Sequence, residues 1–284
     1  MGDERKRTLS RRQLLGLGGG IITTFGIGSV AAYRRDRSFP DTDADGIPDA
    51  VKRSASVHEN LTSVFGPSTF DGFEVGRREL VIDARYVGES SIAPRTKTRL
   101  RDRFAANDIH LHWLDYPTAY DRTWFEATYG YQVERILLPY HSFYRHHVET
   151  FLKNIAIQLI VLPVASPELQ SLYAVSRDDE FNGVSFGNRC LVAPPASPDS
   201  EAKLVLHEIG HLVLCHDFSG DNTGVMGPEP AELDFTDGEW DQFRNGLSNV
   251  RDTTGADITM RRCIIEETAS DLGQRVESHS PQFP

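Results

Sequence analysis

Several segments of the chain gather apolar, β-branched residues in the short runs that form β-strands. The segment 77–87, RRELVIDARYV, has this composition. The run 154–165, NIAIQLIVLPVA, is the most apolar of the chain, and 181–196 carries another apolar run that ends in two prolines. These patterns predict three strands, with 154–165 at the centre of the sheet.

A further strand is predicted over 109–116, IHLHWLDY, where apolar and polar residues alternate at the start. The apolar residues are expected to face the core, which places His110 and His112 on the opposite face. Two histidines at this spacing could hold a metal ion, but the wet face of a half-buried strand is their more common place. We therefore expect both histidines to face solvent.

Helical periodicity separates these predicted strands. It is found in 95–109, in 119–133 and in 141–153. The resulting order of strands and helices predicts one compact α/β domain over 68–250.

Residues 197–212 predict the helix that carries the candidate chemistry. Ser197 suits the N-cap and Pro198 suits the first helical position. An apolar stripe follows at helical spacing, formed by Val205, Ile209 and Leu212. His207 and His211 are also four residues apart, so both imidazoles project from one side of the helix.

Two imidazoles one helical turn apart have the spacing needed to place two nitrogens on one zinc ion. Glu208 lies next to the first of them and is placed to act as general base toward a metal-bound water. This pattern predicts a zinc site with His207 and His211 as ligands and Glu208 as the catalytic residue.

The stretch HEIGHLVLCHD (207–217), followed by GVMG (224–227), resembles the metzincin clan of zinc metallopeptidases. That clan carries HExxHxxGxxH or HExxHxxGxxD, and then a methionine in a tight turn beneath the metal. The resemblance implies hydrolysis of peptide bonds and an α+β, zincin-like form of the α/β class. In that form a mixed twisted sheet packs on the HExxH helix, a C-terminal helix lies below the site, and Met226 is an apolar floor.

The third zinc ligand depends on where the helix ends, because this chain has Leu214 where the clan carries glycine. In a continuous helix His216 would lie about 180° from His207, and Asp217 about 80° away. Neither would reach the same zinc unless the helix stopped near Leu214 or Cys215. Strict spacing selects Asp217, whereas a one-residue deletion that removed the glycine selects His216. We expect His216, with Asp217 as the alternative ligand.

Two other interpretations stay open. Gluzincins take the third ligand from a downstream glutamate, and this chain offers Glu229, Glu232 and Glu239. Glu239 also completes a capping box, Thr236-Asp237-Gly238-Glu239, before a predicted helix with the apolar stripe Trp240, Phe243, Leu247 and Val250. The other interpretation is a non-catalytic surface protein stabilised by metal, although a structural zinc would not need Glu208.

Residues 1–37 have the composition of an export signal. Arg11 and Arg12 precede a weakly apolar, glycine-rich stretch at 14–33, which resembles a twin-arginine signal. A stretch of about 20 residues can span a bilayer as a helix, so it could be kept as a membrane anchor or cleaved near Ala31. Either outcome predicts an exported protein, extracellular or at the cell surface.

The segment DTDADGIPD (41–49) gathers four carboxylates, those of Asp41, Asp43, Asp45 and Asp49. Their spacing resembles an EF-hand or thrombospondin type 3 loop, and Ca²⁺ prefers such oxygen ligands. The twelfth loop position, normally a bidentate glutamate, is Lys52. The sequence leaves open both calcium binding and a plain acidic linker over 38–67.

Composition narrows the partners. The net charge of −11 argues against nucleic acid, and the absence of a CxxC pair argues against a cysteine zinc knuckle. Cys190, Cys215 and Cys263 allow one disulfide and a thiol, or three thiols. Residues 251–284 are polar and are expected to form a C-terminal extension. We therefore predict an exported zinc-dependent metallopeptidase acting on a peptide or protein substrate.

Overall fold

The computed structural model describes residues 40–129, 143–148, 150–163, 183–186, 188–194, 197–214, 224–226 and 234–251. Its centre is a five-stranded sheet with the order β2-β1-β3-β5-β4. The strands are β1 (Arg78–Tyr86), β2 (Ile109–Asp115), β3 (Ile157–Val161), β4 (Gly183–Phe186) and β5 (Arg189–Val192). Four strands are parallel, and β4 runs antiparallel to β5. The predicted α/β class is confirmed.

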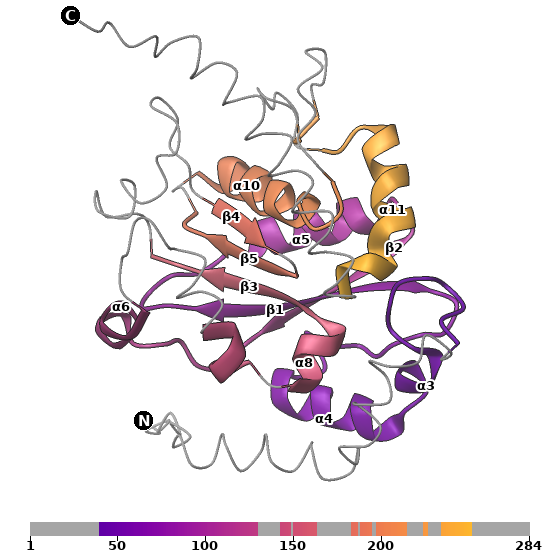
Figure 1. Cartoon of the computed structure of the whole chain (residues 1–284), viewed down its shortest axis with the longest axis horizontal. Helices are drawn as coiled ribbons and strands as arrows, with labels where there is room; N and C mark the ends of the chain where they lie inside the picture. The colour runs from indigo at the N-terminus through magenta and orange to yellow at the C-terminus, as the bar shows by residue number, and fades with distance from the viewer. Residues whose placement is uncertain are drawn as a thin grey trace, which may run out of the picture.

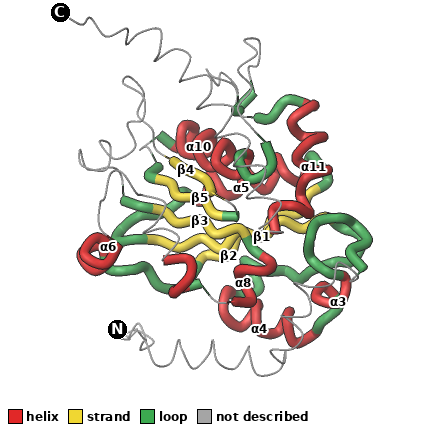
Figure 2. The backbone as a smooth tube through the Cα atoms, in the orientation of Figure 1, coloured by secondary structure: helices red, strands yellow, loops and turns green. Residues whose placement is uncertain are grey.

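Helices cover both faces of the sheet, and Figure 2 shows the strands as a yellow layer between red helices. One face carries α5 (Pro94–Ala105), α10 (Pro198–Gly210) and α11 (Asp237–Arg251), and Figure 1 draws α10 above β4 and α11 to the right of the sheet. The other face carries α3 (Asp49–Lys52), α4 (Ala55–Phe65), α6 (Arg122–Tyr129) and α8 (Thr150–Ile155). The predicted helices at 95–109, 119–133 and 141–153 correspond to α5, α6 and α8.

The central strands are buried on both faces. All five residues of β3 are buried, and so are seven consecutive residues of β1. A parallel strand covered on both faces reads as a continuous apolar run, because each side chain meets a hydrophobic layer. The apolar run 154–165 therefore predicted the central position correctly, since β3 pairs with β1 on one side and β5 on the other.

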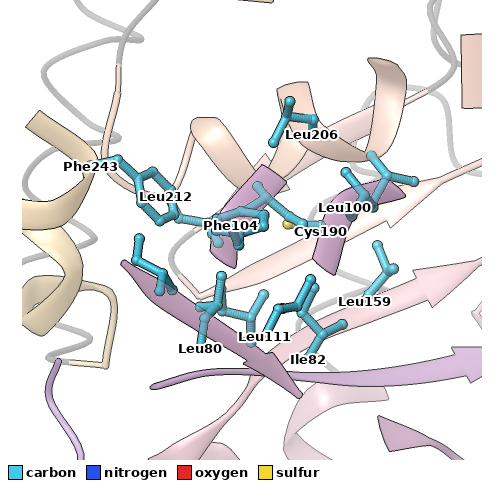
Figure 3. Close-up of a cluster of buried hydrophobic side chains, with 14 of the residues drawn as sticks. Leu80, Ile82, Leu100, Phe104, Leu111, Leu159, Cys190, Leu206, Leu212 and Phe243 are labelled. Atoms are coloured by element: carbon cyan, nitrogen blue, oxygen red, sulfur yellow. The ribbon is translucent and has the colours of Figure 1, made fainter. Parts of the chain in front are cut away.

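The first hydrophobic core fixes α10 on the sheet. Figure 3 shows side chains from strands and helices meeting in this core, among them Leu80, Ile82, Leu100, Phe104, Leu111, Leu159, Leu206, Leu212 and Phe243. Each large aliphatic or aromatic side chain buried there contributes roughly 1.5–3 kcal/mol. The helix that carries the HExxH pattern is thereby held against a rigid sheet.

The second core lies on the opposite face and includes the segment expected to be a linker. Residues 40–67 contain α3 and α4, and Ile47, Val57 and Leu61 are buried in one cluster with residues of β1 and β2. The expectation of an acidic linker over 38–67 is corrected for its described part, because these apolar side chains share a core with the sheet.

Two local predictions near the ends of the domain have different outcomes. The run 181–196 forms two strands instead of one, because β4 and β5 fold back on each other as a hairpin. The capping box of α11 is confirmed: the Thr236 N–H donates to Glu239 Oε2 at 2.7 Å, and the Glu239 N–H donates to Thr236 Oγ1 at 3.3 Å. The apolar stripe that follows is buried at Trp240, Phe243 and Leu247.

The predicted export signal and residues 252–284 of the predicted C-terminal extension lie outside the described residues. In the part of the chain that the structure describes, no helix has both the length and the apolar character needed to cross a membrane.

Candidate metal centre

The helix α10 begins where its sequence predicts but ends earlier than the predicted range 197–212. Ser197 is the N-cap residue, Pro198 is the first helical residue, and the regular helix ends at Gly210. A tighter turn follows, in which the N–H groups of Val213 and Leu214 both donate to the Gly210 carbonyl, at 2.9 and 2.7 Å. The change of direction thus begins before Leu214, the position at which sequence reasoning expected it.

The two histidines of α10 bring their Nε2 atoms together. The rings of His207 and His211 lie 4.6 Å apart between centroids, and their Nε2 atoms are 3.0 Å apart. Two nitrogens bound to one tetrahedral zinc at about 2.0–2.1 Å would be separated by about 3.3 Å. The pair is therefore within a few tenths of an ångström of the separation that a shared zinc ion requires.

The orientation of His207 is fixed by a backbone group. Its Nδ1 lies 2.7 Å from the carbonyl oxygen of Val225. A carbonyl can only accept a hydrogen bond, so Nδ1 carries the proton and Nε2 carries the lone pair in the neutral ring. This is the tautomer that a metal-binding imidazole needs, and a carbonyl partner on the other ring nitrogen is common among such ligands.

Met226 lies against the same helix. Its side chain is fully buried, and a Cβ added to Gly210 would come within 2.4 Å of the Met226 sulfur. The ring of Phe235 approaches the same point to 2.9 Å. Only a glycine allows the methionine to sit this close to α10, one residue before His211.

Glu208 points toward the sheet edge formed by β4. It is 1% exposed, and its Oε2 lies 2.5 Å from the hydroxyl oxygen of Ser185. The same hydroxyl lies 2.7 Å from the Glu208 backbone carbonyl. Burial raises the pKa of Glu208 to about 8, against the opposing effect of the Ser185 hydrogen bond. The single hydroxyl proton cannot serve both oxygens, so a protonated carboxyl satisfies this contact best.

Sequence reasoning missed the β4 residues that contact Glu208. A Cβ on Gly183 would lie 2.3 Å from Glu208 Oε1, so this glycine makes room for the carboxyl group. Gly183 and Ser185 are two residues apart in a strand and therefore share a face. Two small residues at that spacing were the available signal, but nothing in the sequence links them to the helix that starts at Pro198.

Cys190 lies behind the same helix in the first core. It is fully buried, and its thiol donates to the Glu208 carbonyl with a sulfur–oxygen distance of 3.4 Å. Burial raises the pKa of this thiol well above its ordinary value. Cys215 and Cys263 lie outside the described residues, as do both candidates for the third zinc ligand, His216 and Asp217.

The gluzincin alternative has one candidate ligand in the described part of the chain. Glu239 is 8% exposed and accepts the hydrogen bond that caps α11. Glu229 and Glu232 lie outside the described residues.

The aspartate-rich loop is organised around a lysine. The ammonium of Lys52 lies 2.6 and 2.7 Å from the two oxygens of Asp43, and 2.7 Å from Asp45 Oδ2. Its third direction is filled by the carbonyl oxygen of Arg77 at 2.9 Å. The lysine at loop position twelve thus places a positive charge between carboxylates of the loop.

The two outer aspartates of this loop bind backbone and hydroxyl groups. Asp41 accepts N–H groups of Asp45 and Gly46, and Asp49 accepts both the N–H and the hydroxyl of Thr42. Oxygens of Asp41, Asp43 and Asp49 also lie within 4.8 Å of one another, which is close enough for one cation. The sequence left calcium binding open, and the Lys52 ammonium among the carboxylates of Asp43 and Asp45 favours the alternative in which the loop needs no calcium.

The two histidines of β2 differ from their expected place. His110 is partly exposed, but His112 is 1% exposed and packs against the rings of Phe70 and Phe73, at 5.0 and 5.3 Å between centroids. The expectation that both face solvent is wrong for His112, because the segment before β1 covers that face of the strand.

No protein-family model, curated protein or solved structure matches this chain. The arrangement of His207, His211 and Glu208 against β4 therefore has to be interpreted from its own chemistry. That arrangement brings two imidazole nitrogens together and places a buried carboxyl group on the residue next to His207.

Proposed function

We propose that this protein is a zinc-dependent metallopeptidase that hydrolyses peptide bonds, with a metzincin-like site. The observation that carries the proposal is the 3.0 Å approach of the His207 and His211 Nε2 atoms. Glu208 follows His207 directly, and Met226 packs beneath the turn at Gly210. A helix with two satisfied histidines would need neither the glutamate nor the close methionine.

The donor set fits zinc. Two neutral imidazoles suit a borderline-soft ion, and the Val225 carbonyl holds His207 in the required tautomer. Bound zinc would supply a Lewis acid that polarises the scissile carbonyl and acidifies a water molecule. His216 is the proposed third ligand, with Asp217 as its alternative.

Glu208 is proposed to move the proton. Its carboxyl group faces β4, where it contacts Gly183 and is hydrogen-bonded to the Ser185 hydroxyl. In its ionised form Glu208 would accept a proton from the attacking water and pass it to the leaving amine. Ser185 would hold the carboxyl group in place while the backbone of β4 borders the substrate.

The substrate is proposed to bind along β4 as an added strand. The neighbouring strand β5 cannot take this role, because it pairs with β3 on one side and with β4 on the other. Only a strand at the edge of a sheet can accept another strand, and β4 is last in the strand order. An extended peptide beside β4 would pass close to Glu208.

The remaining parts of the proposal follow from sequence. Residues 14–33 would direct export and would serve as a membrane anchor if they are not cleaved, which gives an extracellular or cell-surface enzyme. The partner is a peptide or protein, and the net charge of −11 gives no support for nucleic acid.

The test compares hydrolysis of casein and short peptides by the wild type and Glu208→Gln, together with their zinc content. Loss of a general acid–base group is expected to lower the rate by about 10²–10⁴-fold, while zinc is retained. The matched control is Glu201→Gln, because Glu201 is another buried glutamate of α10 and binds the Ala93 N–H at the far end of the helix. This control is expected to keep its activity.

Three outcomes separate the candidate functions. A wild type that holds no zinc overturns the proposal. Zinc in both proteins with no hydrolysis by either favours the non-catalytic, metal-stabilised class. If hydrolysis is found, the zinc affinities of His216→Ala and Asp217→Ala identify the third ligand. If Glu229→Gln or Glu232→Gln loses zinc affinity instead, the protein is a gluzincin.

A further inference from the structure

A second group of metal-binding side chains lies at the other edge of the sheet. Asp71, His110 and His112 each offer a ligand atom, and these three atoms lie within 4.8 Å of one another. His110 and His112 belong to β2, which is the edge strand opposite β4. The cluster therefore has no residue in common with the site on α10.

The distances within this cluster match those around one ion. Asp71 Oδ1 lies 3.1 Å from His110 Nε2 and 3.3 Å from His112 Nδ1. Ligand atoms around a tetrahedral zinc are separated by about 3.3 Å when each bond is about 2.0–2.1 Å. One carboxylate oxygen is thus placed at ligand spacing from both imidazoles.

The two ring nitrogens of His112 have different partners: Nδ1 faces the cluster, and Nε2 faces Glu79. The contact with Glu79 determines which nitrogen carries the proton. His112 Nε2 lies 2.9 Å from Glu79 Oε2. A carboxylate accepts, so Nε2 carries the proton and Nδ1 carries a lone pair in the neutral ring. That lone pair and the Asp71 oxygen then face each other at 3.3 Å. Two acceptors are held at this distance favourably when a cation lies between them.

Glu79 is itself held in place. It is fully buried, and its Oε1 accepts the Glu74 N–H at 2.9 Å and the Arg77 Nε–H at 3.0 Å. A carboxylate that fixes the far nitrogen of a histidine is the usual second layer around zinc ligands, where it sets the ring orientation. The cluster therefore has the supporting contacts that a surface group of histidines and aspartates lacks.

We propose that Asp71, His110 and His112 form a second metal site, for a divalent transition metal ion of the zinc class. Two imidazoles with one carboxylate favour zinc over Mg²⁺ and Ca²⁺, which prefer oxygen ligands. The side chains of Asp71 and His110 are 60% and 32% exposed, so an ion can enter and solvent can complete its coordination. His112 forms the buried end of the site.

This metal would join two parts of the chain. Asp71 lies between α4 and β1, whereas both histidines lie on β2. An ion shared by them would fasten the segment that carries Phe70 and Phe73 over the edge strand. The proposed role is therefore to stabilise the fold at an edge of the sheet, away from the proposed hydrolysis.

The experiment counts zinc in variants that remove one site at a time. Each protein is equilibrated in a zinc buffer, and bound zinc is measured by mass spectrometry of the element. The wild type is expected to bind two zinc ions, and His207→Ala/His211→Ala to keep one. Adding His110→Ala or Asp71→Asn to that double variant is expected to remove the last ion. His110 and Asp71 are chosen because their side chains are at least partly exposed, so their substitution should leave the fold intact. Circular dichroism of each variant checks that it is folded.

Two further variants sharpen the test. His146→Ala removes an exposed histidine outside the cluster and is expected to keep all bound zinc. Glu79→Gln leaves the three ligands in place and is expected to weaken zinc binding by about 10–100-fold. Co²⁺ in place of zinc should give visible absorption bands in the double variant that disappear with His110→Ala.

The proposal is overturned if the His207→Ala/His211→Ala protein binds no zinc, or if His110→Ala and Asp71→Asn leave its zinc affinity unchanged. Failure of the proposed function gives a different result. In that case the wild type binds one ion, which is kept in His207→Ala/His211→Ala and lost in His110→Ala.

Discussion

The aspartate loop at 41–49 and the histidine helix α10 both gather polar side chains, but they differ in where a positive charge comes from. In the loop, the buried ammonium of Lys52 lies within 2.7 Å of carboxylate oxygens from Asp43 and Asp45. On α10, two imidazole nitrogens approach each other to 3.0 Å, and a neutral imidazole brings no charge of its own. The first arrangement is balanced within the chain, whereas the second suits an ion from outside.

The difference shows that one position in a motif can determine whether the motif binds a metal ion. The aspartate spacing alone resembles a calcium loop, but the residue at position twelve is a cation instead of a bidentate glutamate. Buried charges are tolerated when they are paired and hydrogen-bonded. Lys52 meets this condition, because it pairs with Asp45 and both side chains are 0% exposed. A carboxylate-rich motif therefore indicates a metal site only when the chain itself supplies no cation to its carboxylates.

The largest expected effect comes from removing that internal cation. Lys52→Ala leaves two carboxylates buried without their partner, so the free energy of unfolding should fall by about 3–5 kcal/mol. Urea unfolding followed by circular dichroism measures it. Arg53→Ala is the control, since Arg53 pairs with Asp49 from a side chain that is 63% exposed, and a loss of about 0–1 kcal/mol is expected. Equal losses in both variants would contradict the internal-cation interpretation.

The next effect compares two added ions. Zinc at about 100 times its dissociation constant should raise the free energy of unfolding by about 2.7 kcal/mol for each site that it fills, and His207→Ala/His211→Ala should lose the contribution of the α10 site. Calcium should leave the wild type unchanged but stabilise Lys52→Glu, which restores the usual twelfth loop residue. Thermal unfolding at matched ion concentrations checks both. A wild type stabilised by calcium would show that Lys52 does not replace this ion.

A smaller effect tests how tightly α10 sits on Met226. Gly210→Ala places a methyl group within 2.4 Å of the Met226 sulfur, and such overpacking should cost about 1–3 kcal/mol. Gly238→Ala is the control in the first turn of α11, where no atom lies within 4 Å of an added Cβ, so no cost of overpacking is expected. Chemical denaturation of the two variants measures the contrast. A neutral Gly210→Ala would mean that the methionine does not pack at this point.

The smallest expected effect concerns the pKa of Asp49 in the aspartate loop and the stability of the protein at low pH. Hydrogen bonds from the hydroxyl and N–H of Thr42 lower the pKa of Asp49 below its ordinary value of 3.8. A lowered pKa in the fold stabilises the protein above pH 3.8, and this contribution is lost as pH falls through the folded-state pKa. Thr42→Val should raise the Asp49 pKa and shift acid unfolding to higher pH. Carboxyl titration by NMR measures the pKa, and an unchanged value would refute the assignment.

Elements buried on both faces were the easiest to predict. The runs 77–87 and 154–165 correspond to β1 and β3, since a continuous apolar run is enough to specify a strand inside a parallel sheet. The capping box of α11 was also predictable, because both of its partners lie within four residues. The sequence did not predict that 181–196 forms two strands, because only two residues lie between the end of β4 and the start of β5.

Contacts between distant segments were beyond reach of the sequence. The alternation in 109–116 placed His112 outward, but Phe70 and Phe73, about forty residues earlier, cover it. The contact of Ser185 with Glu208 and that of Lys52 with Asp43 likewise depend on how separate elements fold together. Within α10, in contrast, helical geometry alone predicted that His207 and His211 would share one side.

The order of the strands also bears on how the chain folds. A hydrogen bond joins Tyr86 to Asp115 across 29 residues, whereas the Gln158 side chain reaches Asp83 across 75 residues. Closing longer loops costs more entropy, so β1 and β2 are expected to pair before β3 and β5 join them. The helix α10 packs on the completed strands and would dock last. Pulse-labelled hydrogen exchange should therefore show protection in β1 before α10, so that the histidine pair forms as a late folding event.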